Sequence, residues 1–254
     1  MSVRHALPAP LDHRQAMALQ QHELERAVEV LGSLTPHDWS APTECPAWDV
    51  RRMYLHVLGA CEAGASTTES VRQMVSAFRR RRREGGPLEA ALSATQVAAR
   101  EHLTPTELVD RLRDVAPRCV AGRQRMPGFL RAHVSMKVDG PVVERWRLGY
   151  LVDTIYLRDL WLHRVDLCRA VGRPFECTAD HDGVIVADVV QEWAARHGQP
   201  FRLVLTGPAG GEFAVGADGD RIASDALELD AVEFCRVVGG RARGDGLLAT
   251  IVPF

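Results

Sequence analysis

The chain has 254 residues, of which 46% are hydrophobic and 25% are charged, and its formal net charge is −2. This composition is ordinary for a globular protein of one large domain or two modest ones. The small net charge gives no overall field that would attract nucleic acid or an anionic membrane, so neither partner is expected. Six cysteines without a CxxC pair, and no N-terminal apolar segment of signal-peptide length, favour a cytoplasmic protein.

The first part of the chain predicts long helices. Apolar residues recur along residues 12–34 and suit a first helix. After a turn, Asp49 has the character of an N-cap, and an apolar stripe of helical period follows it. A second helix is therefore expected from residue 50 as far as the arginines at 79–83, where cations suit a helix C-terminus.

The middle of the chain begins with a break at the Gly-Gly-Pro sequence of residues 85–87. Another helical segment is expected from there through about residue 99. The sequence Thr-Pro-Thr-Glu at 104–107 matches a capping box with proline at the first helical position, which predicts a helix through residue 120. Residues 121–145 have an irregular pattern.

Residues 146–171 predict a long helix that is apolar over most of its circumference, as in a bundle interior. Beyond Pro174, short alternating runs with glycine and aspartate favour a small antiparallel sheet. The elements expected there are helices at 181–197 and 230–239 and strand-like runs at 201–207, 214–216, 220–227 and 247–254. The expected fold class is α+β with two domains, a four-helix bundle in residues 1–174 and a small α+β domain with an antiparallel sheet in residues 175–254.

The sequence LRDLWLHRVDL at 157–167 places polar residues within a buried helix. Asp159, His163 and Asp166 fall within about 60° of one another on a helical wheel, and Tyr156 borders the same strip. A buried carboxylate is usually paired, hydrogen-bonded or bound to a metal. Carboxylate and imidazole at i and i+4 can bind one metal ion together.

A third candidate ligand is His56 in DVRRMYLHVLGA, where small residues surround it on the helical wheel. If the second and last bundle helices are neighbours, His56, Asp159 and His163 form a set of two nitrogens and one oxygen with an open coordination position. That arrangement is typical of catalytic metal sites. From spacing alone, a His–Asp pair of this kind is most often an ordinary ion pair, and a histidine at the edge of a core is commonly satisfied by a backbone carbonyl, so these interpretations stay open beside metal binding. The tryptophans Trp39, Trp48 and Trp161 are expected in the bundle core.

Three stretches of the chain resemble one protein family. DWSAPTECPAWDVRRMYLHVLGA resembles the Trp, Pro-Thr, Cys-Pro, Trp and His pattern of the mycothiol-dependent maleylpyruvate isomerase family, whose helical bundle is DinB-like. LRDLWLHRVDLCRAVGRP is similar to the second signature of that family. LTGPAGGEF and DALELDAVEFCRVVGGR resemble its small C-terminal domain, so the resemblance covers nearly the whole chain.

The resemblance implies a divalent metal, usually zinc, held by His56, Asp159 and His163. The family often has glutamate at the position of Asp159, and the shorter side chain leaves the identity of the metal open. A small shift of the helix, or participation of Asp166 as a ligand, is expected to compensate for the shorter side chain of Asp159.

The resemblance also implies an arginine of the C-terminal domain at the active site. Arg241 in VVGGRARG is the best match, with Arg236 and Arg243 close by. Arg241 is therefore a candidate for catalysis and for cofactor binding, Tyr156 for cofactor binding and Asp166 for catalysis.

The expected function is that of an enzyme whose metal binds the sulfur of mycothiol, for cis–trans isomerisation or thiol transfer on a small carboxylate-bearing electrophile. A thiol that coordinates zinc is deprotonated. Its addition to a double bond would leave a single bond free to rotate, and Arg241 would hold the substrate carboxylate. Three alternatives stay open: a metal-dependent hydrolase with Asp166 as base, a non-haem iron oxygenase and a non-catalytic binding bundle. The chain is expected to be a monomer or a homodimer.

Overall fold

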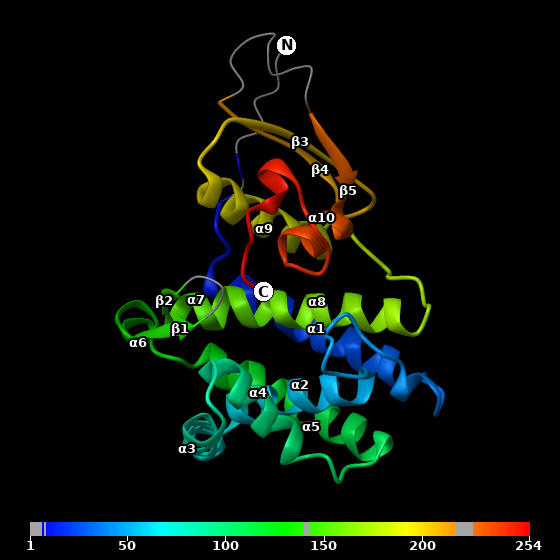
Figure 1. The fold of residues 1–254 in the computed structure, drawn as a ribbon, viewed down its shortest axis with the longest axis vertical. Helices are drawn as coiled ribbons and strands as arrows, with labels where there is room; N and C mark the ends of the chain where they lie inside the picture. Colours follow the sequence, from blue (N-terminus) through cyan, green and yellow to red (C-terminus); the bar gives the residue numbers. More distant parts are fainter. Residues whose placement is uncertain (1–6, 8, 140–142, 217–225) are drawn as a thin grey trace. The chain divides into compact units, whose positions relative to one another are not determined.

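The computed structural model describes residues 7, 9–139, 143–216 and 226–254, which form two compact units. The larger unit comprises residues 12–174 and is mainly helical; the smaller comprises residues 175–254 with the described part of residues 1–11 (Figure 1). The predicted mixture of helices and sheet is confirmed, whereas the assignment of residues 1–174 and 175–254 to two domains stays a prediction. Among the described helices, none combines the length and the apolar character that crossing a membrane requires.

The first helices begin at aspartate caps, of which Asp49 was predicted. Helix α1 spans His13–Gly32, and the Asp12 carboxylate accepts a hydrogen bond from the third residue of the helix, as in a capping box. After the 3₁₀ turn η1 at Asp38–Ser40, Asp49 caps helix α2, which spans Val50–Ala65. Local capping therefore fixes where both helices start.

The prediction of one helix from residue 50 to the arginines at 79–83 is wrong. Helix α2 ends at Ala65, and Ser66 is extended with φ −143°. The Ser66 hydroxyl accepts from the Glu69 backbone N–H at 3.3 Å and starts helix α3, Thr67–Glu84. Because serine at an N-cap satisfies a free backbone donor, a new helix begins here instead of the old one continuing.

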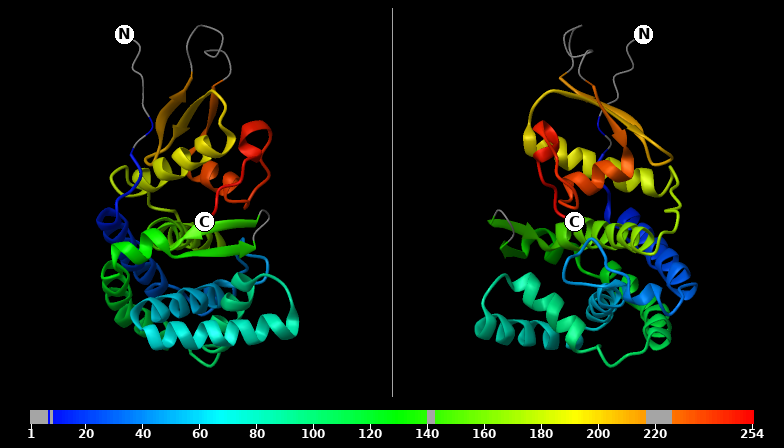
Figure 2. Two further views of the ribbon diagram at one scale, coloured as in Figure 1. Left: turned by 90° about the vertical axis from the view of Figure 1, so that its left-hand side faces the viewer. Right: turned by 45° about the vertical axis from the view of Figure 1, so that its right-hand side comes forward.

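Helices α4, Leu88–Ala98, and α5, Pro105–Gln124, begin near their predicted positions. The hydroxyl of Thr104 and the carboxylate of Glu107 form the predicted capping box of α5. Helix α4 packs beside α3 and against α2 (Figure 2). The contact between these three helices brings Gln96 of α4 to His56 of α2, a residue of the candidate site described below.

A β-hairpin lies in the region of irregular pattern. It follows the short helix α6, Gly128–His133, and pairs strand β1, Ser135–Asp139, with strand β2, Val143–Arg147, in antiparallel register. The predicted long helix therefore begins after β2, with α7 at Leu148–Tyr150, a π-helical segment η2 at Leu151–Ile155 and α8 at Tyr156–Ala170. Single π turns inside helices occur frequently at functional sites. Here the π segment directly precedes the helix that carries Asp159 and His163.

The core of the larger unit lies between α1, α2, α5 and α8. Its apolar side chains come from the predicted helical stripes and are excluded from water, which is the main favourable contribution to folding. Trp39 and Trp161 are buried as predicted. The largest fully buried aliphatic side chains are Leu24, Leu31, Met53, Leu55, Leu58, Leu108 and Leu112.

The described part of the smaller unit contains a three-stranded sheet and two α-helices. Its elements are α9 at Asp182–His197, β3 at Phe201–Thr206, β4 at Gly211–Val215, β5 at Leu227–Asp230, α10 at Ala231–Val238 and the 3₁₀ turn η3 at Gly246–Ala249. The strand order is β4-β3-β5. Strands β3 and β4 are antiparallel, whereas β5 is parallel to β3, so the prediction of an antiparallel sheet is wrong for β5.

Two further predictions concern the smaller unit. The strand-like run at 220–227 lies outside the described residues except for its last two, of which Leu227 begins β5. The predicted final strand at 247–254 is wrong, because residues 246–249 form η3 and the residues after it form no strand. Val252 instead donates one backbone hydrogen bond to the last residue of α10, Val238, at 2.9 Å. The buried side chain of Val252 therefore lies beside the end of α10 and not in a strand.

Candidate metal centre

Three side chains from two helices converge in the larger unit. His56 comes from α2, and Asp159 and His163 lie one turn apart on α8. The Asp159 carboxylate lies 3.8 Å from His56 Nε2 and 3.3 Å from His163 Nε2. One ligand atom from each residue lies within 4.8 Å of the other two, which is a separation that one metal ion could bridge. The structure thus brings together the three residues predicted from spacing and resemblance.

The three candidates differ in exposure. The side chain of His163 is 5% exposed and that of His56 is 13% exposed, whereas that of Asp159 is 29% exposed. Because Asp159 is the most accessible of the three, an incoming molecule would reach the group from its side. A catalytic metal site needs such an open position.

The electrostatics of the group follow from burial and from close opposite charges. Burial by itself raises the pKa of Asp159, but His163 and His56 outweigh it and hold that pKa well below its ordinary value. Burial lowers the pKa of His163, and the nearby Asp159 outweighs it and raises that pKa well above the ordinary value. The carboxylate is therefore ionised at neutral pH and offers an anionic oxygen.

His163 provides a direct test of whether a metal fits. Both of its ring nitrogens are buried, and neither has a hydrogen-bond partner of good geometry among the described residues. An unsatisfied buried polar atom costs about 1–3 kcal/mol. Two imidazole nitrogens and one carboxylate oxygen are donors that zinc prefers, so the donor set and the unsatisfied Nε2 atom fit a divalent ion.

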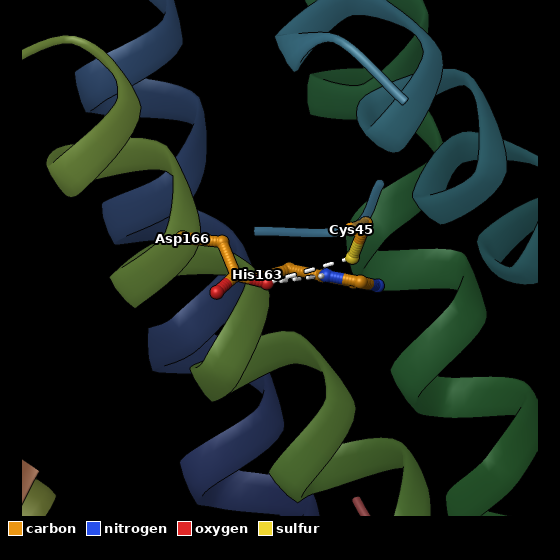
Figure 3. Close-up of side chains that lie close together, drawn as sticks. All are labelled: Cys45, His163 and Asp166. Atoms are coloured by element: carbon orange, nitrogen blue, oxygen red, sulfur yellow. Dashed lines mark hydrogen bonds and ion pairs between the residues drawn. The ribbon is translucent and has the colours of Figure 1, made fainter. Parts of the chain in front are cut away.

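Cys45 and Asp166 lie on the other side of the His163 ring. Figure 3 shows both Cys45 and His163 directed at the Asp166 carboxylate. Asp166 Oδ2 is 3.6 Å from His163 Nδ1 and 3.7 Å from Cys45 Sγ. The Asp166 side chain is fully buried. A carboxylate at Nδ1 of a histidine ligand typically orients the ring, which places Asp166 behind His163 relative to Asp159.

His56 also has neighbours that the spacing of the sequence did not reveal. Its Nδ1 atom lies 2.8 Å from Gln96 Oε1, and its ring stacks on that of Trp48 with centroids 5.0 Å apart. Trp48 is half-buried at the edge of the core, so the prediction that it lies inside the core is wrong. Trp48 instead covers one face of the His56 ring and shields it from solvent.

Tyr156, the predicted cofactor residue, lies at the start of α8 and is half-buried. The Arg123 guanidinium lies 4.1 Å from the centroid of its ring, a cation–π distance. Burial raises the pKa of the Tyr156 phenol. In the same region a hydrogen bond from Cys61 is the main cause that lowers the pKa of Cys119 to about 7. The role of Tyr156 in cofactor binding stays a prediction.

The predicted arginine belongs to the other unit. The backbone N–H of Arg241 donates to the Arg236 carbonyl at 2.8 Å in the turn that ends α10. The Arg236 side chain is buried and bonds to Glu233, and the Arg243 side chain is 92% exposed. Arg241 lies in the smaller unit and the three candidate ligands lie in the larger one. Its catalytic role stays a prediction.

Comparison with known proteins identifies the family of the chain. The family model described as the mycothiol maleylpyruvate isomerase N-terminal domain matches residues 20–168, more than half of the chain. The chain belongs to the mycothiol-dependent maleylpyruvate isomerase family. This is a family of enzymes, and the matched residues include all three candidate ligands.

Solved structures show the same fold. A crystal structure of the mycothiol-dependent maleylpyruvate isomerase is 18% identical, with a TM-score of 0.55, and the match covers 93% of this chain and 92% of that chain. A histidine-to-alanine mutant of that enzyme is 16% identical, also with a TM-score of 0.55, over 91% of this chain and 90% of that chain. At this identity the likeness concerns the fold alone. No curated protein matches the chain.

Proposed function

We propose that the chain is a metal-dependent enzyme that uses mycothiol to isomerise a small carboxylate-bearing electrophile or to transfer the thiol to it. Membership of the mycothiol-dependent maleylpyruvate isomerase family supports the use of the thiol. The convergence of His56, Asp159 and His163 on one point is the observation that carries the proposal. Zinc is the metal we propose, because two nitrogens and one oxygen with an open position form a typical catalytic zinc site.

The chemistry divides among residues of the larger unit. A bound zinc ion would supply the positive charge that deprotonates a coordinating thiol at neutral pH. Asp159 contributes the negative charge of the ligand set, and its low pKa keeps it ionised. Trp48 and the burial of His163 exclude water from the inner side of the group, so ligands approach from the side of Asp159.

Asp166 is better placed to orient His163 than to act as a base on substrate. It is fully buried, and its nearest contact in the group is Nδ1 of His163. Arg241 stays our candidate for binding the substrate carboxylate, because guanidinium binds carboxylates in a bidentate manner. Tyr156 stays our candidate for contact with the thiol cofactor.

The proposal is tested by metal analysis and by thiol-dependent turnover. We expect the purified wild type to contain one zinc ion and to convert maleylpyruvate only when mycothiol is present. His163→Ala should bind zinc more than ~100-fold more weakly, because it removes a ligand. His102→Ala, which changes an exposed histidine, is the matched control and should retain the metal. Full zinc occupancy in His163→Ala, or equal turnover without thiol, would show the proposal to be wrong.

A further inference from the structure

A chain of buried and partly buried hydrogen bonds connects His56 on α2 to Gln73 and Glu69 on α3. His56 Nδ1 lies 2.8 Å from Gln96 Oε1 on α4, and Gln96 Nε2 donates to Gln73 Oε1 on α3 at 2.9 Å. Gln73 Nε2 then donates to the carbonyl of Gly59 at 2.9 Å and to Glu69 Oε1 at 2.8 Å. The side chains of Gln73 and Gln96 are 1% and 3% exposed, so water does not replace these partners.

The outer end of this chain is fixed in its direction. A backbone carbonyl can only accept a hydrogen bond, and an ionised carboxylate can only accept as well. Hydrogen bonds from Arg72, Gln73 and Arg100 lower the pKa of Glu69 to about 2, so it is ionised at neutral pH. The atom of Gln73 that faces Gly59 and Glu69 must therefore be its NH₂ group.

This direction propagates inward one amide at a time. With its NH₂ group turned outward, Gln73 presents its oxygen to Gln96, so the atom of Gln96 that faces it must be a donor. The other atom of the Gln96 amide, its oxygen, then faces His56 and can only accept. The proton must lie on His56 Nδ1, which leaves the lone pair of the neutral ring on Nε2.

We propose that Gln73 and Gln96 are positioning residues that hold His56 in the tautomer protonated at Nδ1 and direct its Nε2 lone pair at the point shared with Asp159 and His163. This inference deepens the proposed function, since it specifies how one ligand of that same site is oriented. Histidine ligands of metals almost always donate their other ring N–H to an acceptor, and an amide oxygen serves that purpose here.

Gly59 makes the relay possible. A Cβ atom at this position would lie 2.6 Å from Gln96 Cβ and 2.8 Å from Gln96 Cγ. Gly59 and His56 lie about one turn apart on α2. Only glycine at position 59 lets α4 approach α2 closely enough for Gln96 to reach His56. The Gly59 carbonyl is also one of the two acceptors that fix the direction of the Gln73 amide.

The direct test is the tautomer of His56 in metal-free protein labelled with ¹⁵N-histidine, read from long-range ¹H–¹⁵N correlations and assigned with His56→Ala. We expect the wild type to carry the His56 proton on Nδ1. Gln96→Met and Gln73→Met should each increase the population protonated at Nε2. They should also weaken zinc binding roughly 10–100-fold in chelator competition. Gln20→Met is the matched control, since Gln20 is fully buried and hydrogen-bonded to Arg123 and to the Val152 carbonyl but does not contact His56.

A wild-type protein with the His56 proton on Nε2 would overturn the inference. So would Gln96→Met with an unchanged tautomer and unchanged zinc affinity, or a Gln20→Met control with the same losses. A wild type that binds no zinc but carries the proton on Nδ1 would support the relay and contradict the proposed function, so the two failures are distinguishable.

Discussion

Replacing Gly59 by alanine should affect the metal centre more than the fold. The added Cβ would lie 2.6 Å from Gln96 Cβ, whereas carbon atoms normally approach to about 3.5–4.0 Å. Helix α4 must therefore move away from α2 by about 1 Å. The hydrogen bond from His56 Nδ1 to Gln96 Oε1, 2.8 Å in the wild type, would lengthen to about 3.8 Å and be lost.

The change in stability is the difference between two opposing effects. Overpacking in a core costs about 1–3 kcal/mol. Alanine in a helix interior is about 1 kcal/mol more favourable than glycine. The free energy of unfolding should therefore fall by only about 0–2 kcal/mol. Loss of the contact that orients His56 should weaken zinc binding roughly 10–100-fold.

Urea unfolding and zinc titration against a chelator measure the two effects separately. Gly32→Ala is the matched control, because Gly32 lies at the end of α1 and a Cβ there meets no atom within 4 Å. It should leave the zinc affinity unchanged and not lower stability. If Gly59→Ala bound zinc as tightly as the wild type, the reasoning from close helix approach to His56 orientation would be refuted.

Three further changes test other contacts. Gly122→Ala places a Cβ 2.2 Å from the Gly64 carbonyl oxygen, which a rotamer change cannot relieve, so urea unfolding should show a loss of about 3 kcal/mol. Glu69→Gln should lower the free energy of unfolding at neutral pH. The pKa of Glu69 is about 2, below that of an unfolded glutamate, so the difference in stability between wild type and variant should shrink as pH falls below about 4 and vanish near 2. Cys61→Ala removes the main cause of the low Cys119 pKa, which should rise from about 7 toward about 8.5 in a ¹³Cβ NMR titration; an unchanged value would contradict that cause.

Helix starts were predictable because their signals are local. Asp12, Asp49 and the Thr104–Glu107 pair lie directly at the ends that they cap. The break between α2 and α3 has the same kind of signal, since Ser66 precedes Glu69 by three residues as in a capping box. The prediction missed it because it ended the helix at the arginines of 79–83 and did not weigh the polar run Ser-Thr-Thr-Glu-Ser at 66–70. The parallel strand β5 had no comparable local signal, because strand direction is decided by pairing partners distant in sequence.

The candidate metal residues were predictable for a different reason. Asp159 and His163 are one helical turn apart, so the spacing of the sequence already places them together. Assigning His56 to the same site required either the family resemblance or an assumption about which helices are neighbours. Gln96 is 40 residues from His56 in the sequence and lies on another helix, so only tertiary packing brings it to the ring. The sequence carries no spacing that could have identified it.

The two histidines are held from different sides by groups of different charge. Gln96, a neutral amide on α4, contacts Nδ1 of His56, whereas Asp166, a buried carboxylate on α8 itself, faces Nδ1 of His163. Helices α3 and α4 supply none of the three proposed ligands, yet the orientation of His56 depends on their packing against α2. A change that loosens α4 should therefore disturb His56 and leave the His163–Asp159 pair intact. Residual weak zinc binding should then require His163, so combining Gly59→Ala with His163→Ala should abolish the binding that either single variant retains.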